Sequence, residues 1–166
     1  MNESRMLEVD KRTVEVTATA LTPLRAVLDE VVEANSFGEA CGVGACGACT
    51  VLIDGHSVLS CLVPVGVVEG RSITTIAGLP DGDPVVEAFI DANAFQCAAC
   101  TPGFVMATHE LLRLGIDPGD DDAITAGLAG NLCRCGSYGP IVEAVRVALA
   151  ASVATTGERT EDGVDG

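Results

Sequence analysis

The stretch CGVGACGACTVLIDG, from Cys41 to Gly55, places three cysteines close together and ends in an Asp-Gly dipeptide typical of tight hairpin turns. A fourth cysteine, Cys61, follows beyond that turn. The spacing C-x4-C-x2-C with a distant fourth cysteine is that of plant-type 2Fe–2S ferredoxins. Gly42, Gly44 and Gly47 would let the backbone curl and turn its amides toward a small anionic group. The stretch therefore predicts an iron–sulfur loop joined to a β-hairpin.

Two other interpretations of this first quartet are a disulfide framework and a structural zinc site. Disulfides suit short secreted chains, whereas the N-terminus MNESRMLEVDKRT has no apolar segment of the kind that signals export. Structural zinc usually takes paired C-x2-C knuckles rather than C-x4-C-x2-C in a glycine-rich loop. The 2Fe–2S interpretation is the one that the spacing favours.

A second quartet consists of Cys97, Cys100, Cys133 and Cys135, a C-x2-C and a C-x-C far apart in the sequence. By spacing alone, four such thiolates would serve zinc as well as an iron–sulfur cluster. Each pair precedes a predicted helix, and helix N-termini stabilise anions, which favours the more anionic cluster. The spacing itself leaves both metals open.

The first half of the chain predicts strands packed on one helix. Alternating apolar residues on either side of residues 10–12 indicate an opening hairpin. Thr22 followed by Pro23 is typical of a helix start, and the helical spacing of apolar residues runs on to Val31. Further strands are expected at residues 51–53, 58–59 and 73–76.

The second half predicts four helices with short connections, which indicates a small bundle. The helices are expected from Pro84, over residues 103–114 and 122–128, and from Pro140. Gly, Pro and Asp gather at residues 78–84, which indicates a boundary. The sequence thus predicts domains at 1–78 and 79–151, followed by a polar tail at 152–166 that we expect to be disordered.

Charge and hydropathy exclude several classes of function. The formal charge of −15 and the single lysine argue against a nucleic-acid partner, which would need a basic face. No apolar run reaches the roughly 18 residues that a membrane span requires. We therefore expect a cytoplasmic protein with no membrane span, whose thiols are kept reduced.

Three segments together carry a family resemblance: CGVGACGACTVLIDG (41–55), QCAACTPGFVM (96–106) and GNLCRCGSYGPIVEAV (130–145). They are similar to the iron–sulfur subunit of molybdenum hydroxylases, the family of xanthine oxidase, aldehyde oxidoreductase and carbon monoxide dehydrogenase. The resemblance implies an α+β fold, with an N-terminal β-grasp plant-type ferredoxin-like domain followed by an all-α four-helix-bundle domain. It also implies that each domain holds one 2Fe–2S cluster.

The resemblance implies a direction for electron transfer within an oxidoreductase complex. Electrons from a large molybdopterin-binding subunit would reach the second quartet, then the first, and then a medium FAD-binding subunit or a cytochrome acceptor. The chain would carry no catalytic residue of its own. Ala98-Ala99 replaces the commoner Gly-Phe, and Gly136-Ser137-Tyr138 is closer to cytochrome-linked relatives, while Thr101-Pro102-Gly103 fits the flavin-linked type. The acceptor therefore stays open.

Beyond the eight cysteine ligands, the resemblance implies that Gln96 and Cys135 contact the molybdopterin of the partner. A side-chain amide such as that of Gln96 can both donate and accept hydrogen bonds, and the alternative role for Gln96 is a polar cap for the following turn. Gly42, Gly44 and Gly47 would form the loop around the first cluster. Two alternative functions are a free-standing ferredoxin-like electron shuttle and a zinc-stabilised interaction module.

Overall fold

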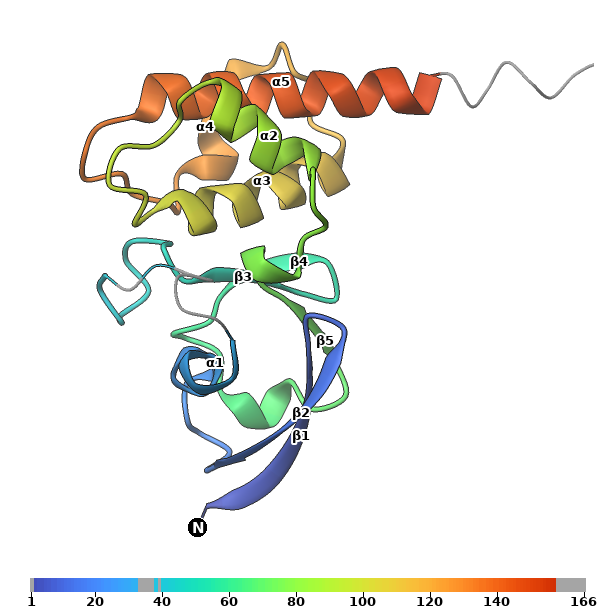
Figure 1. Cartoon of the computed structure of the whole chain (residues 1–166). Coiled ribbons are helices and arrows are strands. Elements are labelled where there is room, and N and C mark those ends of the chain that lie inside the picture. Colours follow the sequence, from blue (N-terminus) through green and yellow to red (C-terminus); the bar gives the residue numbers. More distant parts are fainter. Residues whose placement is uncertain (1, 33–37, 39, 158–166) are drawn as a thin grey trace, which may run out of the picture.

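The structure is a computed structural model that describes residues 2–32, 38 and 40–157. Figure 1 shows two stacked parts, a lower one of five strands and helix α1 and an upper one of helices α2 to α5. Strands precede helices along the chain, apart from α1, which lies between the second and third strands. The mixed α and β architecture is the one that the sequence predicts.

Both predicted hairpins are present. The first joins β1 (Glu3–Val9) to β2 (Arg12–Ala18), and the second joins β3 (Thr50–Ile53) to β4 (His56–Leu59). The two residues of each turn have positive φ: 51° and 62° at Asp10 and Lys11, and 51° and 82° at Asp54 and Gly55. This conformation matches the right-handed twist of the paired strands.

The short strand β5 (Ser72–Thr74) joins the two hairpins into one sheet of order β2-β1-β5-β3-β4. It runs parallel to β1 and antiparallel to β3. The sequence predicted a strand as far as Ile76, but the chain turns into a 3-10 helix there (Ile76–Gly78). The Thr75 hydroxyl accepts a hydrogen bond from the Ala77 amide at 3.2 Å, which favours the turn over a longer strand.

Helix α1 (Leu24–Val31) covers the sheet through Leu24, Val27 and Leu28, as its apolar spacing predicts. The Thr22-Pro23 pair predicts Thr22 as the N-cap and Pro23 as the first helical residue, which is wrong, because Pro23 takes the capping position and Thr22 lies outside the helix. The Thr22 hydroxyl instead lies 2.9 Å from that of Thr19. The Leu24 amide donates to the carbonyl of Val63 at 2.7 Å, so a distant segment supplies the partner that a cap would provide.

The four predicted helices are α2 (Pro84–Asp91), α3 (Thr101–Leu114), α4 (Asp121–Leu128) and α5 (Tyr138–Gly157). Helix α5 is longer than predicted, so the expected disorder is wrong for residues 152–157. No glycine or proline interrupts the chain there before Gly157, and alanine favours a continuing helix. The rest of the predicted tail, residues 158–166, lies outside the described residues.

Each part of the chain has its own hydrophobic core, and β3 belongs to both. Val51 and Ile53 pack in the sheet core with α1, whereas Leu52 packs with the helical core around Phe104. Every residue of β3 is buried, which explains the apolar run from Val51 to Ile53. Among the helices that the structure describes, none is both long and apolar enough to cross a lipid bilayer.

A carboxylate on α3 ties the helical part to the sheet. Glu110 accepts a hydrogen bond from the backbone amide of Ser57 on β4 at 3.2 Å and is paired with Arg113 at 2.7 Å. Arg113 and the Ser57 amide lower the pKa of Glu110 below its usual range. The contact joins residues that are far apart in sequence, so it stabilises the packing of the two parts.

Replacing Glu110 with alanine is expected to destabilise the chain by about 1 kcal/mol, since a partly exposed hydrogen bond to a charged group is lost. The melting temperature should fall by about 3 °C at neutral pH. Because the pKa of Glu110 is lowered in the folded chain, its contribution to the free energy of unfolding is fully present above the ordinary carboxyl pKa. It disappears as the pH falls through the lowered value, so the difference from the unmodified chain should shrink there.

The matched control for this thermal measurement is Glu143→Ala. Glu143 also pairs with an arginine three residues later, Arg146, but the hydrogen bonds found for it do not reach the sheet. An equal loss in both variants at neutral pH would contradict a role for the Ser57 contact.

Candidate iron–sulfur sites

The loop before β3 directs backbone amides at Cys41. Its sulfur accepts hydrogen bonds from the amides of Ala45 at 3.3 Å and Val43 at 3.5 Å. The Val43 amide, the Cys46 thiol and the Ala45 amide lower the pKa of Cys41 to about 6. The glycine at 47, at φ 71°, supplies one of the left-handed turns that the loop needs. The loop therefore stabilises a thiolate, the form that binds metal.

The hairpin β3–β4 brings the other two cysteines of the first quartet together. Cys49 immediately precedes β3 and Cys61 follows β4, and both are buried. Ser60 binds the Cys49 carbonyl twice, through its amide at 3.2 Å and its hydroxyl at 2.8 Å. Burial and the neighbouring Cys49 thiol raise the pKa of Cys61. The distant fourth cysteine is thus placed by strand pairing.

The second quartet lies where α3 and α5 begin. The sulfurs of Cys97 and Cys135 are 3.4 Å apart and exposed, while Cys133 is buried. The Cys133 sulfur accepts from the amide of Ser137 at 3.3 Å, and the Cys133 amide donates to the Tyr138 hydroxyl at 2.9 Å. Cys100 takes the capping position of α3. The predicted convergence of the two helix starts is present.

The surroundings of the second quartet shift the pKa values of its thiols in opposite directions. The Ala99 amide, with help from the Cys135 side chain, lowers the pKa of Cys97. Burial and the Cys133 thiol raise the pKa of Cys100 to about 12. Burial also acts to raise the pKa of Cys133, but the Ser137 amide and the Cys100 side chain outweigh it and leave that pKa lowered.

Within each quartet the thiols interact two by two. The pairs are Cys41 with Cys46, Cys49 with Cys61, Cys97 with Cys135, and Cys100 with Cys133. A 2Fe–2S cluster needs this arrangement, because two thiolates hold each of its irons. Over residues 2–32, 38 and 40–157, no three His, Cys, Asp or Glu side chains gather closely enough to hold a single metal ion. The pairs fit a two-iron cluster.

A buried polar atom beside the second quartet also fits a cluster. The Thr101 hydroxyl is buried without a hydrogen-bond partner, one residue after Cys100. Buried hydroxyls are nearly always paired, and the sulfur atoms of a cluster accept hydrogen bonds. A cluster held by Cys100 would give this hydroxyl an acceptor.

The two sites are joined directly through their backbones. The carbonyl of Cys46 accepts a hydrogen bond from the amide of Leu132 at 2.9 Å, and Leu132 immediately precedes Cys133. The buried side chain of Asn131 donates to the Gly47 carbonyl at 2.9 Å. In Figure 1 the loop before β3 lies at the same end as the starts of α3 and α5. The first cysteine loop therefore rests on the loop of the second site.

Sequence reasoning missed Asn131. Its only signal is its place two residues before Cys133, which does not reveal a contact with a loop more than eighty residues away. The two predicted molybdopterin contacts, Gln96 and Cys135, are both exposed, and Cys135 adjoins the neighbour of Gln96, Cys97. They therefore lie on one exposed edge of the helical part.

A chain with two such four-cysteine sites has the organisation of an electron carrier with two iron–sulfur clusters. Residues 2–96 match the family described as "2Fe-2S iron-sulfur cluster binding domain", and residues 75–146 match the "2Fe-2S binding domain" family. The first match agrees with the cluster that the spacing of the first quartet predicts, and the second agrees with the cluster that the family resemblance implies.

Curated relatives are similar over most of the chain. One nicotinate dehydrogenase subunit of Pseudomonas putida is 42% identical over 88% of this chain and 94% of its own length. The nicotine 6-hydroxylase small subunit of Paenarthrobacter nicotinovorans is 44% identical over 81% of each chain. The crystal structure of quinoline 2-oxidoreductase from Pseudomonas putida 86 matches with a TM-score of 0.81 and 29% identity, covering 92% of this chain and 97% of the matched one.

The chain belongs to the family of iron–sulfur small subunits of molybdenum hydroxylases. It is accordingly an electron-transfer component of an oxidoreductase complex. The resemblance predicted from the three motifs is confirmed.

Two glycines of the first loop provide a matched pair of variants. A Cβ at Gly47 would lie 2.3 Å from the Gly130 carbonyl and 2.6 Å from the Asn131 amide nitrogen, whereas a Cβ at Gly42 would meet nothing within 4 Å. Both residues have positive φ, 71° and 65°, so alanine at either costs about 1–2 kcal/mol of backbone strain. Only Gly47→Ala should also separate the two cysteine loops.

We expect Gly42→Ala to keep both clusters and Gly47→Ala to lose iron from the first site, as measured by iron content and by paramagnetic resonance of the reduced chain. Equal iron content and equal melting temperatures in the two variants would show that the approach of the loops is unimportant.

Proposed function

We propose that this chain relays electrons from the molybdopterin centre of a large partner subunit, through two 2Fe–2S clusters, to an FAD-binding subunit or another acceptor. Each cluster, when bound, takes up and gives back one electron. The observation that carries the proposal is the hydrogen bond from the Leu132 amide to the Cys46 carbonyl, which joins the two cysteine sites. A carrier of electrons between two partners needs its two centres held in fixed contact.

The proposed ligands are the eight cysteines. Cys41, Cys46, Cys49 and Cys61 would hold one cluster, and Cys97, Cys100, Cys133 and Cys135 the other. The amides that face Cys41, Cys97 and Cys133 stabilise negative charge on those sulfurs and so help to set the reduction potential. The Thr101 hydroxyl would add a donor to the second cluster.

The exposed edge of the second site supports a direction for the relay. Cys97 and Cys135 are exposed, and Gln96 next to them is exposed as well, so a partner can reach this pair. We assign the molybdopterin contact to Gln96 and Cys135, with the Gln96 amide able to donate and accept.

The first site has an apolar exposed border that fits the acceptor protein. Val43, inside the cysteine loop, is 72% exposed, and Leu62, directly after Cys61, is 59% exposed. Exposed apolar residues beside a redox site provide a docking surface. We therefore place the acceptor against Val43 and Leu62, beside the first site.

The separate cores support the proposed domains 1–78 and 79–151, with the first a ferredoxin-like β-grasp and the second a four-helix bundle. Helices α2 to α5 all contribute to one core that includes Phe89, Phe104, Ile124 and Val145. All eight cysteines are free of disulfides, which fits a reducing compartment such as the cytoplasm.

Metal analysis tests the cofactor content. Two 2Fe–2S clusters require four irons and four acid-labile sulfides per chain, with two distinct paramagnetic signals after reduction. Cys133→Ser should remove one signal and leave the other, because the first quartet is untouched. Zinc in place of iron, or two signals in Cys133→Ser, would refute the ligand assignment.

Coexpression with the genes that neighbour this one tests the partners. The chain should co-elute with a subunit that holds molybdopterin, and substrate added to the complex should reduce both clusters. A chain that elutes alone while its clusters are intact would favour the free-standing shuttle.

A further inference from the structure

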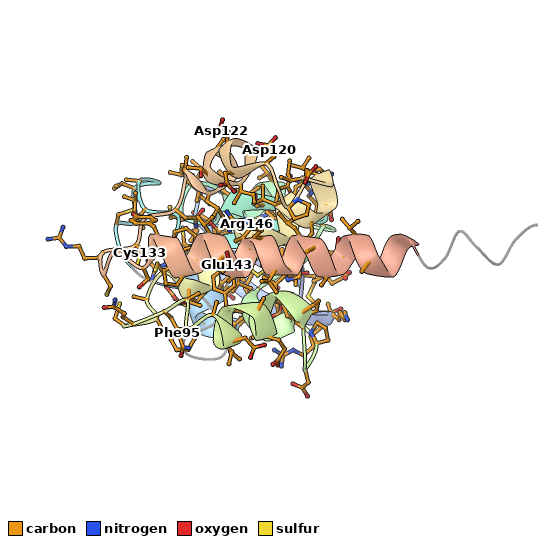
Figure 2. The ribbon with its side chains drawn as sticks, turned by 90° about the horizontal axis from the view of Figure 1, so that it is seen from above. Phe95, Asp120, Asp122, Cys133, Glu143 and Arg146 are labelled. Atoms are coloured by element: carbon orange, nitrogen blue, oxygen red, sulfur yellow. The ribbon has the colours of Figure 1, made fainter. Side chains whose placement is uncertain are left out.

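An apolar groove lies between α4 and α5, the two helices that Figure 2 shows from above. Its volume is about 600 Å³, and Phe104, Leu128, Ile141 and Val142 are among the residues that line it. Arg146 lines the groove farther along α5. The groove is thus a feature of the helical part alone.

Part of the groove lining is exposed. Leu132 is 53% exposed and Tyr138 is 44% exposed, and both line it. Burying a leucine or valine from water is favourable by an amount that corresponds to at least a tenfold change in affinity. A contiguous apolar groove of this kind marks a surface that another molecule covers.

The rim of the groove is acidic. Arg146 pairs with Asp121 of α4 and with Glu143 of α5, each at 2.6 Å, so two carboxylates flank one guanidinium. Asp120 and Asp122, at the start of α4, lie farther from α5 (Figure 2) and border a separate hollow. Asp121, Glu143 and Arg146 therefore sum to a single negative charge beside the apolar lining, which favours a basic partner.

One end of the groove is built from the residues that support the second cysteine site. Leu132 immediately precedes Cys133, and the Tyr138 hydroxyl accepts the hydrogen bond of the Cys133 amide. Exposed Cys97 and Cys135 belong to the same site. A partner that covers these two cysteines is therefore adjacent to the groove.

We propose that this groove binds a segment of the large molybdopterin-binding subunit in which apolar side chains are flanked by lysine or arginine. The inference rests on the proposed function, which supplies the partner at the exposed cysteines. Apolar side chains of the segment fill the groove beside Val142 and Leu132, and its cations meet Asp121 and Glu143. The groove thereby fixes the partner next to the second site.

The test compares Val142→Glu with Val147→Glu in binding measurements between the cluster-loaded chain and the purified large subunit. Val142 lines the groove, whereas Val147 lies on the same helix, is 49% exposed and does not line it. We expect Val142→Glu to weaken this binding by at least tenfold and Val147→Glu to leave it unchanged. Leu132→Ser, at an exposed position, should also weaken binding at least tenfold, and Glu143→Gln should make binding less sensitive to salt.

Intact paramagnetic signals from both clusters show that each variant is folded. The inference is overturned if folded Val142→Glu and Leu132→Ser bind the large subunit normally. It is also overturned if these variants lose self-association of the chain while their binding to the large subunit is unchanged. If the unmodified chain itself does not bind the large subunit, the proposed function fails instead. The two failures are therefore distinguishable.

Discussion

The close approach of two backbone segments, around Gly47 and around Gly130, is the constraint on which the rest of the structure depends. Neither Gly47 nor Gly103 has room for a Cβ, since each would bring one to 2.3 Å from a carbonyl oxygen of the facing segment. Asn131 then fills the remaining space and donates to the Gly47 carbonyl. Because these contacts lie between the two quartets, they fix the position of one metal site relative to the other.

Local chemistry explains what the sequence predicted well. The two hairpins follow from two-residue turns that take positive φ, and the starts of α2 and α4 follow from Asp83 and Asp120, whose carboxylates accept helix amides. The features that could not be predicted depend on distant partners. The start of α1 is set by the Val63 carbonyl. Asn131 acts through the loop at Gly47 and Glu110 through β4 at Ser57, and both of these partners are distant in the sequence. The cysteine spacing predicted the two quartets but not the contact between them.

Each site has an inner and an outer pair of thiols. At the first site the pair Cys49 and Cys61 is buried, and the pair Cys41 and Cys46 is partly exposed. At the second site the pair Cys100 and Cys133 is more buried than the pair Cys97 and Cys135. Since two thiolates hold each iron, each cluster would have one iron facing the protein and one nearer the surface. The arrangement suits a relay, because each centre can be reached from outside while its inner half is held by the core.

The chain separates the charges that stabilise its clusters from those that meet its partners. At Cys41 and Cys133 the hydrogen-bond donors are backbone amides, whose positions are fixed by the loop and by the start of α5. Fixed dipoles of this kind stabilise negative charge without a basic side chain, so a chain with a net charge of −15 can still hold two anionic centres. The carboxylates at the surface are then free to act over longer distances. Since attraction between exposed charges is screened by salt, we expect the carboxylates to influence association, while the backbone amides that face the thiolates influence the properties of the clusters.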